Sequence, residues 1–507
     1  MSTILAGTSR KEHDMVNVGF VGGGRISDLH ALGYKDNPDA RLFAVCDAVA
    51  ERAEARRAEW GAEKAYTDYR ELLADPSIHA VEVLTPYDTH EGIVLDALAA
   101  GKHVACQKPM TTSLESADRI VAAAEAAGVV FKVTEIYTTY PPLVFTKKLI
   151  KDGVIGEPVG MRIKYIASAK GGWEVSATTY EQQMRIAATG LGFETFDHGH
   201  HEWATAWYLL GEVERVCAWI DTTNGVLDDP ATVMWKHRGG KRYGTCDFLF
   251  AEDMTIPSKY YSNDEWFEIT GSRGLILINR GTGELSDRPA VSVCTGATWQ
   301  HYDDIPADWS EGFIGATRNF IAAIQGEEPP RLSGRDGREV LRFGLAVTRS
   351  ASKRREVYLD ELDSAFPALH AWRMRRRERG ECIVGPQRRS GGKTAKYAPQ
   401  ARALTEQLVT RFDPEAAGGW TCVLGLHLTA EGGVSETRYG VYVQDGKLEL
   451  REGMLPDNAD LTLRIPAGVW AAILLGKKRM ETALFQGKIK YEGRAEQGLR
   501  LKSALRL

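Results

Sequence analysis

Apolar and polar segments alternate regularly along residues 15–136. Short apolar runs that are typical of buried strands are each followed by a longer run with apolar residues at helical spacing. The strand-like runs are VNVGFVG, RLFAVCD, HAVEVLTP, KHVACQKP and VVFKVTEIY, and the helix-like runs between them include 25–35, 48–61, 88–101 and 113–128. Such alternation predicts an α/β domain over 15–136 with a parallel sheet and helices on both faces, after an N-terminal tail over 1–14.

The pattern changes after Pro141 and Pro142. The strand-like runs that follow are separated by Gly or Asp turns, and they lie at 159–168, 215–222, 231–237, 243–251, 266–271 and 275–281. Helix-like runs flank them at 202–211 and 311–325. This pattern predicts an α+β domain with a largely antiparallel sheet over 137–370.

A basic stretch, AWRMRRRERGECIVGPQRRSGGKTAKYA, follows this domain. It contains glycines and lacks an apolar period, so we interpret 371–398 as a linker, with a polyanion-binding patch as the alternative. A unit with its own helix, strands and further helices follows. We expect a small α+β domain over 399–507.

Composition narrows the class of protein. A length of 507 residues predicts two to four domains, and a net charge of −5 favours neither nucleic acid nor an anionic membrane as partner. No apolar run approaches the roughly 18 residues that span a bilayer, and the first residues lack the features of a signal peptide. The seven cysteines form no C-x-x-C pair. They indicate reduced thiols, so we expect a cytoplasmic location.

The turn after the first strand, VGFVGGGRIS, places three glycines before a helix. Glycine lets a pyrophosphate approach the N–H groups at the helix start, as in a Rossmann dinucleotide site. Ser27 stands where the pattern G-x-G-x-x-G has its third glycine. A plain turn is the alternative. The expected cofactor contacts here are Gly22, Gly24, Arg25 and Ile26.

The second strand ends in Asp47. A carboxylate at this point can accept hydrogen bonds from the adenosine ribose hydroxyls and would repel a 2′-phosphate. NAD is therefore favoured over NADP as the cofactor. The alternative is that Asp47 only caps the following helix.

Three histidines and an aspartate lie within five residues in FETFDHGHHEWATAWYLLG, residues 193–211. A metal site, a proton-transfer site and a polar helix start are the alternatives. No partner with metal-ligand spacing is evident elsewhere, so no bound metal is expected. Because histidine titrates near neutral pH, His201 can accept the proton that leaves an alcohol oxygen as hydride leaves carbon. Asp197, one helical turn earlier, can orient the imidazole or hold a neighbouring substrate hydroxyl.

The segments EVLTPYDTH, GKHVACQKPM and GFETFDHGHHEWATAWYLLG, together with the glycine turn and AVCD, resemble the glucose–fructose oxidoreductase/inositol dehydrogenase (Gfo/Idh/MocA) family over roughly 15–365. The resemblance implies an NAD-binding Rossmann domain followed by an antiparallel-sheet domain that carries the substrate site. It also implies that Lys108 lies beside the substrate hydroxyl and the nicotinamide, and that Asp197 and His201 match the family's D-x-G-x-H segment. The family's Glu-Lys-Pro is Gln107-Lys108-Pro109 here, which removes one charge near the cofactor.

Further contacts follow from position in the resemblance. Thr85, Pro86 and His90 are expected on the nicotinamide side of the cofactor, with Gln107 and Lys108. The candidates for substrate contact are Tyr137, Tyr140, Trp173, Arg185 and His198. Packing at the sheet edge is the alternative for the aromatic residues and Arg185. An aromatic ring with an arginine suits a polar, anionic or glycosidic substrate.

The last segment, with its order of strand, helix, ALFQGKIKYEG and final helix, resembles a sterol carrier protein type-two domain over about 400–507. The resemblance implies an α+β fold around an apolar tunnel that holds a hydrophobic ligand. A small domain also needs its apolar residues merely to fold. A role as a pocket lid or partner contact, a hydrophobic-ligand site and a structural remnant all stay open.

These observations favour an NAD-dependent dehydrogenase that moves hydride between nicotinamide and a secondary alcohol of a sugar, polyol or glycoside. One alternative is an enzyme that keeps NAD tightly bound and cleaves a glycoside by transient oxidation and elimination. Another is a non-catalytic NAD sensor or hydrophobic-ligand-binding protein. By analogy with the family we also expect a homo-oligomer.

Overall fold

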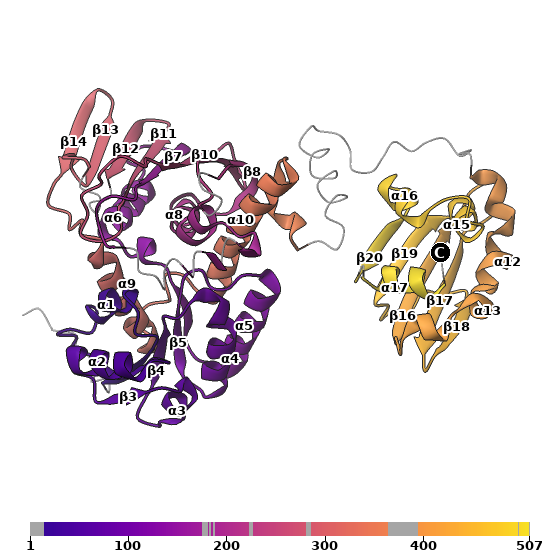
Figure 1. Ribbon diagram of the computed structural model, residues 1–507. Helices are drawn as coiled ribbons and strands as arrows, with labels where there is room; N and C mark the ends of the chain where they lie inside the picture. Colours follow the sequence, from indigo (N-terminus) through magenta and orange to yellow (C-terminus); the bar gives the residue numbers. More distant parts are fainter. Residues whose placement is uncertain are drawn as a thin grey trace, which may run out of the picture. The chain divides into compact units, whose positions relative to one another are not determined.

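The computed structural model describes residues 15–174, 181, 184–185, 188–222, 227–279, 285–363, 394–494 and 496–505 (Figure 1). The chain divides into two compact units, Met1–Leu362 and Asp363–Leu507. The first holds two sheets and the second holds one. The predicted N-terminal tail over 1–14 and most of the predicted linker, up to residue 393, lie outside the described residues.

The first sheet is parallel throughout and has the order β3-β2-β1-β4-β5-β6. Its strands are β1 (Val16–Val21), β2 (Ala40–Cys46), β3 (Lys64–Tyr66), β4 (Ala80–Val83), β5 (His103–Gln107) and β6 (Phe131–Thr134). The order reverses between β1 and β4, which is where a dinucleotide binds in such sheets. The prediction of a parallel Rossmann sheet is therefore confirmed.

The helices of this domain are α1 (Ile26–Ala31), α2 (Ala50–Trp60), α3 (Tyr69–Ala74), α4 (His90–Ala99) and α5 (Leu114–Ala127). Local signals in the sequence set their ends. In α5 the Ser113 hydroxyl accepts a hydrogen bond from the Ser116 N–H, and Gly128 ends the helix in the left-handed region. These ends agree with the Ser start and Gly stop expected from the sequence.

The second sheet has nine strands in the order β14-β13-β12-β11-β7-β10-β9-β8-β15. The strands are β7 (Pro158–Ala167), β8 (Val213–Ile220), β9 (Ala231–His237), β10 (Tyr243–Phe250), β11 (Asn263–Gly271), β12 (Gly274–Asn279), β13 (Val291–Thr295), β14 (Thr298–Tyr302) and β15 (Val357–Tyr358). β7 and β10 pair in parallel, and the other printed pairs are antiparallel. The sheet is thus mixed and mostly antiparallel.

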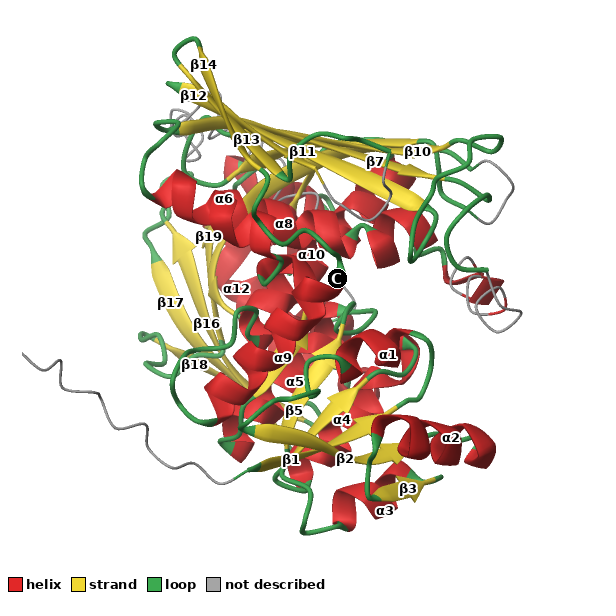
Figure 2. Ribbon diagram, turned by 90° about the vertical axis from the view of Figure 1, so that its left-hand side faces the viewer, coloured by secondary structure: helices red, strands yellow, loops and turns green. Residues whose placement is uncertain are grey.

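Helices cover one face of this sheet: α6 (Pro141–Lys151), α8 (His200–Leu210) and α10 (Gly334–Lys353) lie beneath it in Figure 2. α10 packs against β8 and also against α5 of the Rossmann domain, so it joins the two layers. α9 (Ser310–Ile324) packs on α1. The opposite face exposes Trp219, Met234 and Tyr243. Met234 lies in β9, and Trp219 and Tyr243 pair with Thr232 and Lys236 of the same strand.

The second unit has a five-stranded sheet in the order β18-β17-β16-β19-β20. Its strands are β16 (Cys422–Thr429), β17 (Thr437–Gln444), β18 (Lys447–Glu452), β19 (Leu461–Pro466) and β20 (Lys490–Gly493), and the helices are η5 (Ala395–Gln400), α12 (Ala401–Glu406), α13 (Leu408–Arg411), α14 (Pro414–Ala417), α15 (Ala467–Leu474), α16 (Met480–Phe485) and α17 (Glu496–Ala504). Every residue of α15 is buried, and Trp470 donates a hydrogen bond to the Thr405 hydroxyl at 2.9 Å. The apolar residues thus build a packed core.

The first described helix of this unit begins within the segment that was predicted to be a linker. η5 begins at Ala395, inside the segment assigned to the linker, and Ala398 is completely buried. A short turn with few apolar residues gives too weak a signal in the sequence to be assigned to a core. Within the described part of the chain, no helix is both long and apolar enough to cross a membrane.

We predict that the capping box of α10 contributes measurably to stability. The Ser333 hydroxyl and the Asp336 carboxylate satisfy each other's backbone N–H groups at the start of this 20-residue helix. The substitution Ser333→Ala should lower the free energy of unfolding by about 1 kcal/mol. Urea denaturation followed by fluorescence measures it.

The matched control is Ser352→Ala in the last turn of the same helix, where the hydroxyl is exposed and bonds to the Arg349 carbonyl. We expect it to change the free energy of unfolding by less than about 0.5 kcal/mol. Equal effects of the two substitutions would mean that the cap does not contribute.

Candidate active site

A single cavity of about 1390 Å³ opens at the carboxyl ends of the Rossmann strands and extends to the second sheet. Its walls include the glycine turn, the β4 and β5 ends, and the start of α8. Of the predicted cofactor contacts, nine line it: Gly22, Gly24, Arg25, Ile26, Asp47, Thr85, Pro86, Gln107 and Lys108. Of the predicted substrate and catalytic residues, Trp173, Asp197, His198 and His201 do so.

The glycine turn has the conformation that the sequence predicts. Gly22 has a φ of +109°, and a Cβ there would lie 2.9 Å from the Leu84 carbonyl, so both its backbone angle and its space require glycine. Nothing lies within 4 Å of a Cβ built on Gly24. Ser27, in place of the third glycine, is completely buried and donates a hydrogen bond to the Gly22 carbonyl at 2.8 Å. The serine thus ties the helix to the turn.

Asp47 joins this turn to the next one. One carboxylate oxygen accepts from the Gly23 N–H and the other from the Val49 N–H, both at 2.9 Å. Arg52 lies 3.2 Å from both oxygens. The carboxylate pairs with Arg52 in the first turn of α2 but does not cap that helix, whose N-cap residue is Val49. It lines the cavity where the adenosine ribose of a dinucleotide would lie.

Gln107 takes the place of the family's glutamate, and both the oxygen and the nitrogen of its side-chain amide have a partner. Its side-chain oxygen accepts from the Lys108 N–H at 2.7 Å, and its amide nitrogen lies 2.9 Å from His30 Nε2. The other nitrogen of His30 lies 2.5 Å from the buried carboxylate of Glu82, to which Tyr34 also donates. A carboxylate is thus present behind Gln107, two contacts away from the cavity.

Lys108 and Asp197 form the first functional pair. Lys108 Nζ donates to the Asp197 carbonyl at 2.8 Å and to its carboxylate at 3.1 Å. The two side chains are 14% and 20% exposed. Although 89 residues apart in the chain, they meet at the cavity wall.

His201 is oriented by Glu135, which the sequence interpretation missed. His201 Nδ1 lies 2.7 Å from one oxygen of Glu135 and His200 Nδ1 lies 3.0 Å from the other. The imidazole of His201 stacks on the Tyr137 ring at 4.6 Å. The prediction that Asp197 orients His201 is therefore wrong, because Asp197 binds Lys108 instead.

Burial lowers the pKa of His201 to about 4, although the Glu135 carboxylate opposes this shift. The imidazole is therefore neutral near pH 7. With Nδ1–H donating to the carboxylate, Nε2 carries the lone pair, an assignment that follows from the hydrogen-bond network. Burial acts to raise the pKa of Glu135, but the two imidazoles hold it well below its usual range, so Glu135 stays ionised.

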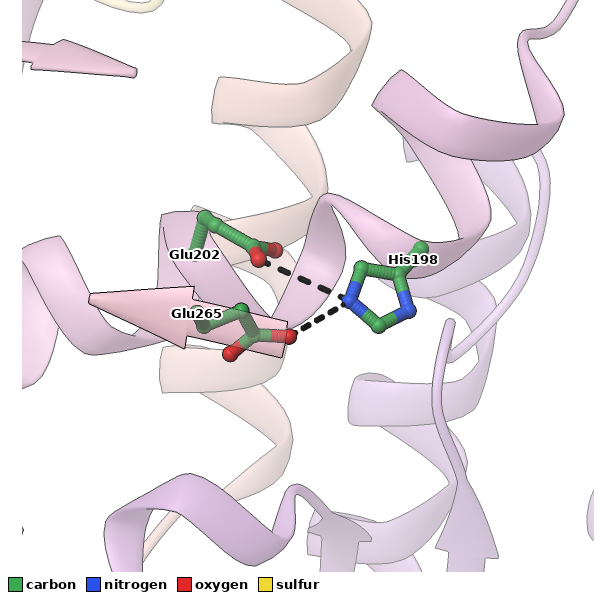
Figure 3. A group of neighbouring side chains, drawn as sticks. All are labelled: His198, Glu202 and Glu265. Atoms are coloured by element: carbon green, nitrogen blue, oxygen red, sulfur yellow. Dashed lines mark hydrogen bonds and ion pairs between the residues drawn. The ribbon is translucent and has the colours of Figure 1, made fainter. Parts of the chain in front are cut away.

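His198 belongs to a separate cluster, which Figure 3 shows. Its Nε2 lies 2.8 Å from a Glu265 oxygen and 3.6 Å from a Glu202 oxygen, and both carboxylates are completely buried. The other oxygen of Glu265 accepts from the Tyr137 hydroxyl at 2.6 Å. One imidazole and two carboxylates are donors that a divalent cation can use. The hydrogen bond to Glu265 already occupies the imidazole nitrogen, so no metal is assigned, and the expectation of none stays a prediction.

Tyr137, Tyr140 and His90, which were predicted as contacts, lie behind the cavity wall and do not line it. The hydroxyl groups of Tyr137 and Tyr140 donate to Glu265 and to the Ala307 carbonyl, and both side chains are 1% exposed. His90 is completely buried, and its two nitrogens lie 2.9 and 3.1 Å from the carbonyls of Thr85 and Pro109. These residues support the walls of the cavity, which corrects their assignment as direct contacts.

Trp173 and Arg185, both predicted as substrate contacts, differ in whether they line the cavity. Trp173 lines the cavity, and the Arg25 guanidinium lies over its ring at 5.2 Å. Arg185 is exposed, lies 3.9 Å from Asp88 and does not line the cavity. Between them, residues 175–180, 182 and 183 lie outside the described part of the chain.

Sequence reasoning missed four buried acids around this cavity: Glu135, Glu194, Glu202 and Glu265. Only Glu135 gave a usable signal, because it directly follows the last Rossmann strand, at the sheet edge where such sites form. The others lie in a helix, a strand and a turn of the second domain. Their convergence depends on the packing of that domain.

Comparisons with known proteins agree with this geometry. A family model described as an oxidoreductase family NAD-binding Rossmann fold matches 16–135, and that family's C-terminal alpha/beta domain matches 147–359. A model described as alkyl sulfatase C-terminal matches 397–507. The matched description is not that of a sterol carrier domain, so that resemblance stays a prediction.

Two curated relatives span most of this chain's first unit. The chain is 28% identical to a myo-inositol 2-dehydrogenase of Thermotoga maritima, over 68% of this chain and 99% of the relative. It is 32% identical to a levoglucosan dehydrogenase of Pseudarthrobacter phenanthrenivorans, over 67% of this chain and 96% of the relative.

Solved structures show the same fold. A probable dehydrogenase from Thermotoga maritima has 26% identity and a TM-score of 0.56, over 68% of this chain and 100% of that one. A levoglucosan dehydrogenase in complex with NADH has 25% identity and a TM-score of 0.58, over 68% and 99%. The chain belongs to the Gfo/Idh/MocA family of oxidoreductases, and it is an NAD-dependent dehydrogenase that acts on CH–OH groups.

Proposed function

We propose that this enzyme transfers hydride between NAD and a secondary alcohol of a sugar, polyol or glycoside. The observation that carries the proposal is that two proton-handling pairs, Lys108–Asp197 and His201–Glu135, line or support the cavity that begins at the glycine turn. The names of the relatives support the substrate class, since they include dehydrogenases of inositol, levoglucosan and apiose.

NAD, when bound, supplies the hydride acceptor. The chain supplies the proton chemistry: the neutral imidazole of His201 accepts the hydroxyl proton at Nε2 while Glu135 holds Nδ1–H and stabilises the imidazolium that forms. The Lys108 ammonium donates to oxygen and stabilises the developing alkoxide. Asp197 holds that ammonium in place through its carboxylate.

We also propose an oligomeric state, a cellular location and a ligand for the second unit. A homo-oligomer is proposed because the sheet exposes Trp219, Met234 and Tyr243 on one face, and such apolar surface commonly marks an interface. A cytoplasmic location and a hydrophobic ligand for the second unit are proposed on the sequence features alone. The apolar residues of the second unit pack into one core, and this packing by itself does not indicate a bound ligand.

Substitutions of Lys108 and His201 test the proposed proton transfer. Lys108→Met and His201→Gln should each lower kcat about 10²–10⁴-fold, because each removes a group that acts on the reacting hydroxyl. The measurement is NADH formation with myo-inositol, levoglucosan, apiose and simple glycosides. Net glycoside hydrolysis without NADH release would instead support the elimination alternative.

The matched control is Lys148→Met, which removes an exposed lysine paired with Asp152 on α6. It should leave kcat unchanged. Calorimetric titration with NAD should show binding by all three variants. Full activity of Lys108→Met would contradict the proposal, and NAD binding without turnover of any alcohol by the unaltered enzyme would favour the non-catalytic alternative.

The lowered pKa of His201 predicts how kcat/KM depends on acid pH. A base works in its deprotonated form, and burial holds the pKa of His201 at about 4, so protonation does not remove the base until the pH approaches that value. We expect kcat/KM to stay level between about pH 7 and pH 5, where an ordinary histidine with a pKa near 6.5 would lose activity.

A pH series on the unaltered enzyme, with recovery of activity checked after return to pH 7, measures this directly. A fall in kcat/KM centred near pH 6.5 that is absent at saturating substrate would show that His201 is not shifted. Glu135→Gln should lower kcat over the whole range, because the imidazole loses the carboxylate that orients it.

A further inference from the structure

Glu194 is a carboxyl group in the cavity wall that the proposed proton transfer does not use. It lies in the single π-helical turn Phe193–His198, which also carries Asp197 and leads into α8. π-Helical turns are rare and often occur at functional sites. The side chain is 5% exposed and lines the same cavity as Asp197 and His201.

The neighbours of this carboxyl group are mostly acidic. Asp228 accepts from the Glu194 N–H at 2.6 Å and from the Thr195 N–H at 2.9 Å, and Asp229 and Asp197 are also close enough to act on Glu194. The Tyr165 hydroxyl, from β7, is a favourable side-chain partner. Among the described residues no lysine or arginine forms an ion pair with Glu194, and its Oε2 atom is buried with no hydrogen-bond partner.

This environment favours the neutral acid. Burial first, and then the charge of Asp228, raise the pKa of Glu194 to about 8, and the Tyr165 hydrogen bond only partly opposes the shift. Asp228 has more hydrogen-bond donors than Glu194, because two backbone N–H groups and the Thr195 hydroxyl donate to it. A buried carboxyl with one donor and three acidic neighbours is protonated near pH 7.

We propose that Glu194 contacts the substrate as a neutral carboxylic acid and donates a hydrogen bond to an oxygen that can only accept one, the ring or glycosidic ether oxygen of a cyclic sugar. The proposal rests on the proposed function, because it assigns the cavity to a sugar. A neutral acid can donate to an ether oxygen, whereas the buried carboxylates of Glu135 and Glu265 accept from histidine or tyrosine.

The proposal separates two kinds of substrate. Every oxygen of myo-inositol is a hydroxyl, which can donate or accept, whereas levoglucosan contains two ether oxygens, which only accept. As the pH rises through about 8, Glu194 loses its proton and its lone pairs face those of an ether oxygen. A hydroxyl can turn and donate to the carboxylate, so the loss falls on the ether-containing substrate.

The test compares the two substrates on the full-length, NAD-saturated enzyme between pH 6.5 and pH 9.5. For the unaltered enzyme, we expect kcat/KM for levoglucosan to fall about tenfold relative to that for myo-inositol as the pH rises through 8, mainly through KM. In Glu194→Gln the amide still donates but does not titrate. The ratio of the two kcat/KM values should then stay constant across the range.

The matched control is Glu91→Gln, which removes a partly exposed carboxylate paired with Arg119 outside the cavity lining and should keep the pH-dependent ratio. Infrared difference spectra of the NAD-loaded protein give a readout that does not need turnover. A carbonyl band of a protonated carboxylic acid should be present at pH 7, disappear by pH 9.5 and be absent in Glu194→Gln.

The outcomes are distinct. Absence of that band from the unaltered enzyme at pH 7, a constant substrate ratio in the unaltered enzyme, or the same pH-dependent ratio in Glu194→Gln would each overturn the proposal. Turnover of myo-inositol with no binding of levoglucosan or of a methyl glycoside would overturn it too. If no alcohol in the panel reduces NAD, the proposed function fails while the infrared result still decides whether Glu194 is neutral.

Discussion

The burial of Glu135 between two imidazoles is the constraint on which the site depends. A completely buried carboxylate must be compensated, and here His200 and His201 each direct Nδ1 at one of its oxygens. This arrangement fixes the ring of His201 against Tyr137 and leaves its other nitrogen for the substrate. Because Glu135 directly follows the last Rossmann strand and the histidines begin α8, the same contact joins the cofactor domain to the substrate domain.

Buried acids with different partners have different chemistry in one cavity. Glu135 faces two histidines and stays charged, whereas Glu194 faces aspartates and one tyrosine, and its pKa is raised. Environment alone can thus divide carboxyl groups between orienting and donating roles. Gln107 also meets a buried carboxyl group through a histidine, since its amide nitrogen contacts His30, whose other nitrogen contacts Glu82.

Most of the fold could be predicted from local patterns. Apolar runs followed by amphipathic helices identified the parallel domain, and α5 begins and ends where the sequence predicts. The parallel pairing of β7 with β10 could not be read this way, because strand order within a sheet leaves no mark on apolar alternation. The short helix η5, which begins at Ala395, was missed for a similar reason: a short helical turn has almost no periodicity.

The sequence by itself determined the residue types at the chemical centre, namely a glycine turn, an acid after the second strand, Lys108 and His201, because motifs fix spacing and side-chain chemistry. Tertiary structure alone decided which acid serves which base: Asp197 holds Lys108, Glu135 holds His201, and Tyr137 supports Glu265 without lining the cavity. The physical reason is that hydrogen bonds reach about 3 Å, and which groups come that close depends on the packing of distant strands and helices.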